Sequence, residues 1–269
     1  MKRHIVFSLV FVLLCQSRAF AASITDFESP PDQTLLLELF SSENKKGSPD
    51  AEKWINQYLA SPELWKTVFP VVYHVEYNDK PGWPDKFVKK EFTHRFMAFA
   101  KKWGVRVPYV PTLMLNGTEW TGWGREESVP NRSPKSVGVL KAKKVTMDEF
   151  GVTFESTDET SHAWVANAVL VGCGLSTIIE GGDNLGKTMD HEFTALRVVS
   201  QPMELERGAY KATIKLPQKT EVRTNGLAVI FWVTNGDDVI PIQAVGGYII
   251  LPVKKDQKGH KADPDTLYF

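Results

Sequence analysis

Apolar and polar positions divide the first half of the chain into short buried runs and amphipathic segments. Residues 35–40 and 68–75 are apolar runs that predict strands buried on both faces. Apolar side chains recur with helical spacing over residues 54–59 and 92–103, which predicts two helices. A third strand is predicted over residues 112–116. The order strand, helix, strand, helix, strand indicates an α/β unit with a parallel core.

The second half of the chain has a different pattern. Seven segments of strand composition follow one another between residues 139 and 245, separated by turn signals such as Asn235-Gly236. Short strands at this spacing are typical of an antiparallel β-sandwich. Residues 125–136 are polar with two prolines and are interpreted as the linker.

The first residues predict an export signal. A basic start precedes the apolar run 5–14, and Ala19-Phe20-Ala21 is a small-x-small cleavage site. We therefore expect a signal peptide over 1–21, no membrane anchor after its cleavage, and a periplasmic or secreted mature protein. The predicted divisions are 22–128 for the first domain, 129–253 for the β-rich domain and 254–269 for a flexible tail.

Charge and cysteine content exclude several functions. The 269 residues carry 32 Lys and Arg against 32 Asp and Glu, so the net charge is zero and no nucleic-acid partner is expected. Of the two cysteines, Cys15 leaves with the signal, so the mature chain keeps Cys173 alone. One thiol cannot form an internal disulfide or run intramolecular dithiol exchange.

The segment from Trp103 to Gly117 is the most specific local signal. A predicted helix ends near Gly104, and Val110-Pro111-Thr112 leads into an apolar strand. This order resembles the cis-proline loop of thioredoxin folds, and Pro111 is predicted to be cis. In that fold the loop orders an edge that can pair with a substrate backbone.

Several further blocks carry a resemblance to one family. They are Glu38-Leu-Phe-Ser-Ser42, His74-Val-Glu-Tyr-Asn-Asp79, Gly82-Trp83-Pro-Asp85, Val110-Pro-Thr-Leu-Met-Leu-Asn-Gly117 and Gly182-Asp-Asn-Leu-Gly186-Lys-Thr-Met-Asp-His-Glu-Phe193. In this order they resemble the secreted bacterial thioredoxin-like proteins known as domain of unknown function 1223. The resemblance implies an α/β thioredoxin-like domain followed by an antiparallel β-sandwich-like domain. The retained cis-proline loop suggests a groove for an exported protein or peptide at the edge formed by Tyr109, Val110, Pro111, Thr112, Trp120 and Trp123. The two tryptophans could form a binding platform, but we favour the alternative that they cover the seam between the two domains.

The chain departs from that family at the redox site. Many members carry a C-x-x-C between the first strand and the first helix, and here Lys45 and Ser48 fall at those positions. Neither side chain can attack a disulfide as a thiolate does. We therefore expect a binding or scaffold protein without dithiol redox activity.

Two alternatives stay open at this point. His74, Glu76 and Asp79 form a polar cluster that could perform acid–base chemistry, and His191 and Glu192 could add ligands from the second domain. The histidines lack close ligand spacing such as H-E-x-x-H, so no metal site and no cofactor are predicted. Cys173 could act as a single redox thiol, although its place at the end of an apolar strand favours a buried structural cysteine.

Overall fold

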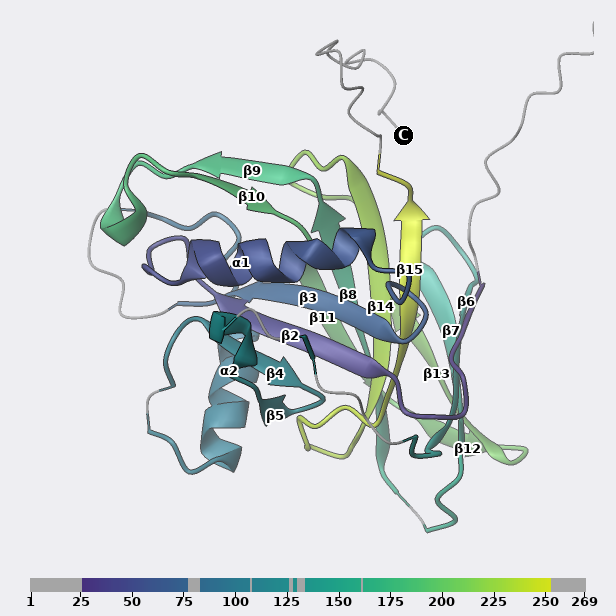
Figure 1. Ribbon diagram of the computed structural model, residues 1–269. Helices are drawn as coiled ribbons and strands as arrows, with labels where there is room; N and C mark the ends of the chain where they lie inside the picture. Colours follow the sequence, from purple (N-terminus) through teal and green to yellow (C-terminus); the bar gives the residue numbers. More distant parts are fainter. Residues whose placement is uncertain are drawn as a thin grey trace, which may run out of the picture.

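An eight-stranded sheet runs through the whole molecule (Figure 1). The computed structural model describes residues 26–76, 83–106, 108–125, 128–129, 134–160 and 162–252. The sheet has the order β15-β14-β8-β11-β3-β2-β4-β5. Its strands are β2 (Leu35–Ser41), β3 (Val68–His74), β4 (Thr112–Leu115), β5 (Thr118–Glu119), β8 (Trp164–Cys173), β11 (Thr194–Pro202), β14 (Gly226–Asn235) and β15 (Gln243–Ile250).

The predicted α/β thioredoxin-like domain with a separate β-sandwich-like domain is wrong as a fold class. The protein is β-rich: in the part of the chain that the structure describes, 45% of the residues are in strands and 15% in helices. The parallel pair β2–β3 was expected, but β3 also pairs with β11 through Thr194 and Val72. Local patterns predict individual strands, and they do not reveal that strands from both halves share one sheet. The boundary proposed at residues 128/129 stays a prediction, although this sheet contains strands from either side of it.

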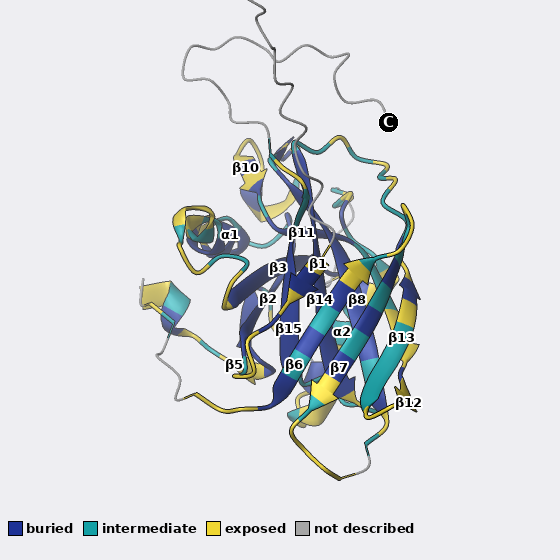
Figure 2. Ribbon diagram, turned by 90° about the vertical axis from the view of Figure 1, so that its right-hand side faces the viewer, coloured by how far each residue is buried: buried dark blue, intermediate teal, exposed yellow. Residues whose placement is uncertain are grey.

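A second sheet of five strands packs against one part of the large sheet. It has the order β1-β6-β7-β13-β12, and Figure 2 shows β6 and β7 lying over β14 and β8. Its strands are β1 (Asp26–Glu28), β6 (Gly138–Lys144), β7 (Glu149–Ser156), β12 (Glu204–Glu206) and β13 (Ala209–Lys215). Burial alternates along β6 and β7, as expected for strands with one face on a core. Phe150, Phe154, Phe231 and Leu170 belong to the apolar layer between the sheets.

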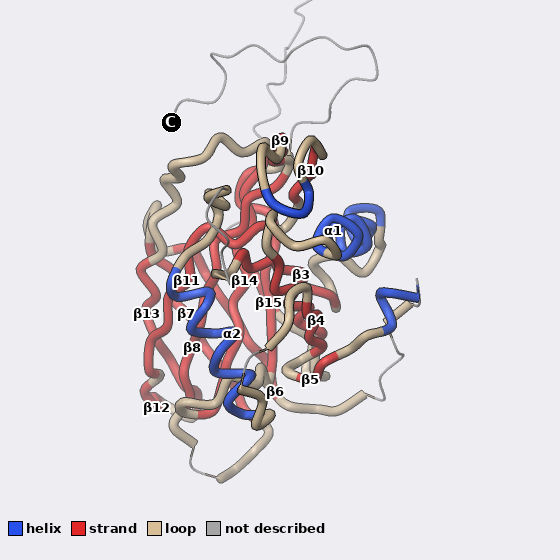
Figure 3. The backbone as a smooth tube through the Cα atoms, turned by 90° about the vertical axis from the view of Figure 1, so that its left-hand side faces the viewer, coloured by secondary structure: helices blue, strands red, loops and turns tan. Residues whose placement is uncertain are grey.

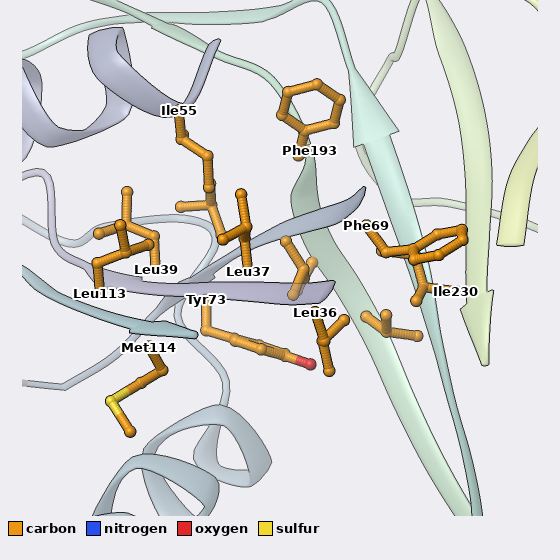
Figure 4. Close-up of a cluster of buried hydrophobic side chains, with 14 of the residues drawn as sticks. Leu36, Leu37, Leu39, Ile55, Phe69, Tyr73, Leu113, Met114, Phe193 and Ile230 are labelled. Atoms are coloured by element: carbon orange, nitrogen blue, oxygen red, sulfur yellow. The ribbon is translucent and has the colours of Figure 1, made fainter. Parts of the chain in front are cut away.

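Two α-helices, among the described residues, cover the other part of the large sheet. Helix α1 (Ser48–Asn56) and helix α2 (Lys90–Lys102) are both amphipathic, as their sequences predict. Figure 4 shows Leu37, Leu39 and Ile55 on one side of the central strands and Tyr73 on the other. Short 3₁₀ turns complete this part, η1 (Gln57–Ala60) after α1 and η2 (Gly122–Arg125) after β5.

A buried ion pair joins α2 to the sheet. The Nε of Arg95 lies 2.5 Å from Oε1 of the fully buried Glu38 on β2. The guanidinium of Arg95 also stacks 4.9 Å from the ring centre of Trp232 on β14. A paired and stacked arginine avoids the large cost of an isolated buried charge.

A two-stranded hairpin extends beside α1 (Figure 3). It consists of β9 (Leu175–Ile178) and β10 (Thr188–His191), with the turn η3 (Gly182–Asn184) at its tip. Within the described part of the chain, none of the helices combines the length and apolar character needed to cross a membrane. The predicted signal peptide and C-terminal tail lie outside the described residues.

Candidate metal centre

The carboxyl ends of β2 and β3 lie side by side. Ser41 and His74 are paired in the parallel register, and each is the last residue of its strand. Loops that leave this edge can place further side chains around His74, as at the carboxyl ends of other parallel strands. Glu43 lies in the loop after β2, and Asp85 lies in the loop before α2. The side chains of both residues reach this edge of the sheet.

The carboxylate of Glu52 lies between two imidazoles. Glu52 is on the buried face of α1, and its Oε2 lies 2.6 Å from Nδ1 of His191 at the end of β10. Its Oε1 lies 3.6 Å from Nε2 of His74 and accepts a 2.5 Å hydrogen bond from the Ser41 hydroxyl. Three elements therefore deliver one carboxylate and two imidazoles to a single point.

Two further carboxylates lie on the outer sides of the imidazoles. Oδ2 of Asp85 lies 2.8 Å from Nδ1 of His74 and accepts the Glu43 backbone N–H at 2.9 Å. Oε1 of Glu43 lies 3.2 Å from Nε2 of His191. Each histidine thus has one nitrogen facing Glu52 and the other nitrogen facing an outer carboxylate.

Aromatic and amide side chains close the centre. The indole N–H of Trp83 donates to Oε2 of Glu43 at 2.7 Å, and the ring of Phe87 lies 5.1 Å from His74 and 5.0 Å from His191. The side-chain amide of Asn184, in η3, donates to the backbone oxygens of Glu43 and Lys45, each at 2.8 Å. The hairpin tip therefore holds the loop that carries Glu43.

The centre is sealed from solvent. His74, His191 and Glu43 are 0% exposed, and Glu52 is 1% exposed. Among the described residues, Nε2 of His74, Nε2 of His191 and Oε1 of Glu43 make no hydrogen bond. Nε2 of His191 and Oε1 of Glu43 at least face each other at 3.2 Å, whereas Nε2 of His74 has no such neighbour. An unsatisfied buried polar atom costs roughly 1–3 kcal/mol, so the His74 nitrogen requires an explanation.

The charges of the centre shift its pKa values in opposite directions. Burial lowers the pKa of His191, but the facing carboxylates of Glu43 and Glu52 outweigh burial and raise the pKa to about 9. Burial raises the pKa of Glu52, and the two histidines outweigh it, so that the net shift is downward. The same opposition of burial and His74 leaves the pKa of Asp85 lowered. The lowered pKa values of Glu52 and Asp85 favour their ionised forms, so the imidazoles face negative charge.

Glu52, His74 and His191 form a set that could hold a metal ion. One ligand atom from each lies within 4.8 Å of the others. Two imidazoles with one carboxylate are ligands that zinc and similar divalent ions accept in proteins. The prediction that no metal site is present had rested on sequence spacing, which cannot detect ligands contributed by three separate elements.

The predicted polar cluster is assembled only in part. His74 is central, whereas Glu76 is exposed and its backbone N–H donates to Thr93. Asp79 lies outside the described residues. His191 does join His74, as the alternative suggested, while Glu192 instead accepts a hydrogen bond from the Gly174 backbone. Sequence reasoning missed Glu52, Glu43 and Asp85, although Asp85 belongs to one of the family blocks.

The positions equated with the redox cysteines lie beside the centre. Pro111 is cis, as predicted, and a Cβ placed on Gly47 would be 3.1 Å from Cδ of Pro111. Gly47 lies between Lys45 and Ser48, so this loop does contact the proline. Ser48 is buried, and its hydroxyl accepts the Ser42 backbone N–H at 3.2 Å. The equivalence of Lys45 and Ser48 to cysteines stays a prediction.

The predicted groove residues lie at the β4–β5 edge of the sheet. Tyr109 is 52% exposed, and its hydroxyl donates to Glu119. Thr112 is buried, and its hydroxyl donates to the Tyr109 backbone oxygen.

The apolar residues of this edge pack onto the core. The ring of Trp120 packs 5.2 Å from that of Trp54 on α1. Trp123 and Val110 pack against the same core; binding of a partner at this edge stays a prediction.

Cys173 is a free thiol inside the molecule. It is 1% exposed at the end of β8. Burial, with a contribution from the charge of Glu192, raises the pKa of Cys173 to about 12. Such a thiol is almost entirely protonated at neutral pH and unreactive.

Comparison with known proteins identifies the family. Residues 36–234 match the family described as "Protein of unknown function (DUF1223)". This chain belongs to the DUF1223 family. Four of the five blocks that suggested this family converge in space, because they supply Ser41, His74, Asp85, Asn184 and His191 to the centre. The thioredoxin-like character that the resemblance implied does not follow from this membership.

Solved structures share the fold at low sequence identity. One is protein AGR_C_4864 from Agrobacterium tumefaciens, which is 18% identical, has a TM-score of 0.53 and matches over 86% of this chain and 99% of that chain. Another is HBP35 of Porphyromonas gingivalis, which is 17% identical, has a TM-score of 0.54 and matches over 88% and 82%. No curated protein matches the chain. At these identities the likeness extends to the fold alone.

Proposed function

We propose that this DUF1223 protein is an exported protein that binds a divalent transition-metal ion through Glu52, His74 and His191. The export part rests on the basic, apolar and small-residue pattern of residues 1–21. The binding part rests on the buried centre.

The observation that carries the proposal is the unpartnered Nε2 of His74. This atom is fully buried, lies 3.6 Å from Glu52 Oε1 and makes no hydrogen bond among the described residues. Because His74 Nδ1 is held by Asp85, the ring cannot turn to satisfy Nε2 without losing that bond. A cation between Nε2 and the Glu52 carboxylate would satisfy both groups.

A purely structural ion-pair cluster explains the centre less well. Burying charged groups costs several kcal/mol per ion unless geometry and hydrogen bonding are excellent. Here Nε2 of His74 is buried with no hydrogen-bond partner among the described residues, and the nearest carboxylate oxygen, Oε1 of Glu52, lies 3.6 Å away. A bound divalent ion supplies the missing positive charge and draws the three ligands together.

The centre favours binding over dithiol redox chemistry. Cys173 is the one cysteine left after signal cleavage, and its buried, protonated thiol lies on β8. Loop residues Lys45 and Ser48 contribute no sulfur beside Pro111. The sealed centre also favours holding an ion over turning over a substrate.

Zinc titration of metal-free mature protein tests the proposal. Isothermal titration with Zn²⁺ should give one site per chain. Glu52→Gln and His191→Gln, which nearly preserve side-chain shape or length, should each weaken binding at least tenfold, while His94→Ala on the exposed face of α2 should not. Folding of each variant is checked by circular dichroism. If the folded wild type takes up no zinc, or if Glu52→Gln binds it unchanged, the proposal is wrong.

A further inference from the structure

The geometry points to a zinc-class ion held through opposite nitrogens of the two histidines. We propose that His74 binds it through Nε2 and His191 through Nδ1. Asp85 and Glu43 accept the remaining ring N–H groups and act as positioning residues. This inference rests on the proposed function and specifies how the same centre binds its ion.

The ring of His74 is oriented by Asp85. Asp85 Oδ2 lies 2.8 Å from Nδ1 of His74, and an ionised carboxylate can only accept a hydrogen bond, so Nδ1 carries the hydrogen. In the neutral ring the opposite nitrogen, Nε2, therefore has the free lone pair, and it faces Glu52 Oε1 at 3.6 Å; binding of the ion keeps the ring in this neutral form. Carboxylate–histidine–metal arrangements of this kind fix the tautomer and the orientation of the ring.

The ring of His191 is turned the other way. Its Nδ1 lies 2.6 Å from Glu52 Oε2, and its Nε2 lies 3.2 Å from Glu43 Oε1. The two nitrogens of an imidazole point away from each other, so the ring separates Glu43 from the space beside Glu52. Glu43 is thus placed to accept the Nε2 hydrogen of His191, while Nδ1 loses its own hydrogen to solvent and binds the ion.

The outer carboxylates are held before any ion binds. Asp85 accepts the backbone N–H of Glu43 at 2.9 Å and that of Phe87 at 3.0 Å. Glu43 accepts the indole N–H of Trp83 at 2.7 Å through Oε2, which leaves Oε1 directed at His191. Because each acceptor is fixed by a neighbour, the orientation of each ring is set by the fold.

The ligand atoms indicate the class of ion. Two imidazole nitrogens and one carboxylate oxygen favour Zn²⁺ and related ions such as Co²⁺, whereas Mg²⁺ and Ca²⁺ favour sites made of oxygen alone. No sulfur ligand belongs to the set Glu52, His74 and His191, and Cu⁺ favours sulfur.

Nitrogen NMR of the zinc-loaded protein tests the assignment. Mature protein labelled with ¹⁵N-histidine is loaded with Zn²⁺, and long-range ¹H–¹⁵N correlations identify the nitrogen that carries hydrogen in each ring. We expect hydrogen on Nδ1 of His74 and on Nε2 of His191. If zinc binds and both rings coordinate through the same type of nitrogen, this inference is overturned and the proposed function stands. Absence of zinc binding overturns both.

Variants of the outer carboxylates test their role. Asp85→Asn and Glu43→Gln should each lower zinc affinity about 10- to 100-fold and should alter the visible absorption of the Co²⁺-loaded protein. Asp50→Asn, an exposed acid on the first turn of α1, is the matched control and should change neither. Unchanged affinity and unchanged Co²⁺ spectra in both folded variants would contradict the positioning role. If either variant fails to fold, the wild-type nitrogen assignment decides alone.

Discussion

The imidazoles of His74 and His191 lie with ring centres 5.2 Å apart and ring planes at 70°. One terminates β3 of the large sheet and the other terminates β10 of the hairpin. The carboxylate of Glu52 lies between their inner nitrogens, so three distant segments meet in one buried centre.

Zinc should stabilise the folded protein. A ligand that binds only the folded state adds about 2.7 kcal/mol when its free concentration is 100 times its dissociation constant. The melting temperature of the metal-free protein should therefore rise by several degrees when zinc is added, as measured by differential scanning calorimetry. Mg²⁺ at the same concentration should have no effect. An equal shift with zinc in Glu52→Gln would show that the ion binds elsewhere.

Removal of Glu52 should destabilise the metal-free protein. Glu52→Ala leaves two buried imidazoles without the carboxylate between them, and loss of one partner of a buried ion pair costs about 3–5 kcal/mol. Urea unfolding followed by circular dichroism measures this change. His94→Ala, at an exposed position, should change the free energy of unfolding by less than about 0.5 kcal/mol. A similarly small change in the free energy of unfolding for Glu52→Ala would mean that the Glu52 carboxylate does not stabilise the two buried imidazoles.

The buried pair Arg95–Glu38 should stabilise the attachment of α2. Arg95→Met leaves Glu38 as an uncompensated buried charge and should lower the free energy of unfolding by about 3–5 kcal/mol. The double variant Arg95→Met/Glu38→Gln should recover much of that loss, because no charge stays unpaired. Chemical unfolding of the single and double variants gives the coupling. If the loss of unfolding free energy in the double variant equals the sum of the two single losses, Arg95 and Glu38 do not stabilise each other and this prediction is wrong.

Cys173 should be inert in the native protein. Since burial contributes most to raising its pKa to about 12, the reactive thiolate is scarce at pH 7 and increases only as the pH approaches that value. Iodoacetamide at pH 7.5 should leave the native protein unmodified by mass spectrometry and should alkylate Cys173 in guanidinium. Rapid modification of the folded protein would restore the single-thiol redox alternative.

Some features of the fold were predictable from local sequence. The strands at residues 35–40 and 68–75, the two amphipathic helices and the cis bond before Pro111 all follow from short-range patterns. The fold class was mispredicted because pairing between β3 and β11 joins the two halves of the chain, and periodicity contains no information about distant partners.

The centre was only partly predictable for a similar reason. His74 was selected because it alternates with Glu76 along a predicted strand, so that both would share one face, and His191 was suggested as an added ligand. Glu52 was missed because a charged residue in an amphipathic helix is normally expected on its exposed face. In the structure it lies on the buried face, where its partners come from β3 and β10.

Anomalous diffraction from crystals of the zinc-loaded protein tests the central claim most directly. Data collected on either side of the zinc absorption edge should show one strong peak per chain, within coordination distance of Glu52, His74 Nε2 and His191 Nδ1. A peak elsewhere, or its absence from this centre in crystals grown with excess zinc, would contradict the account.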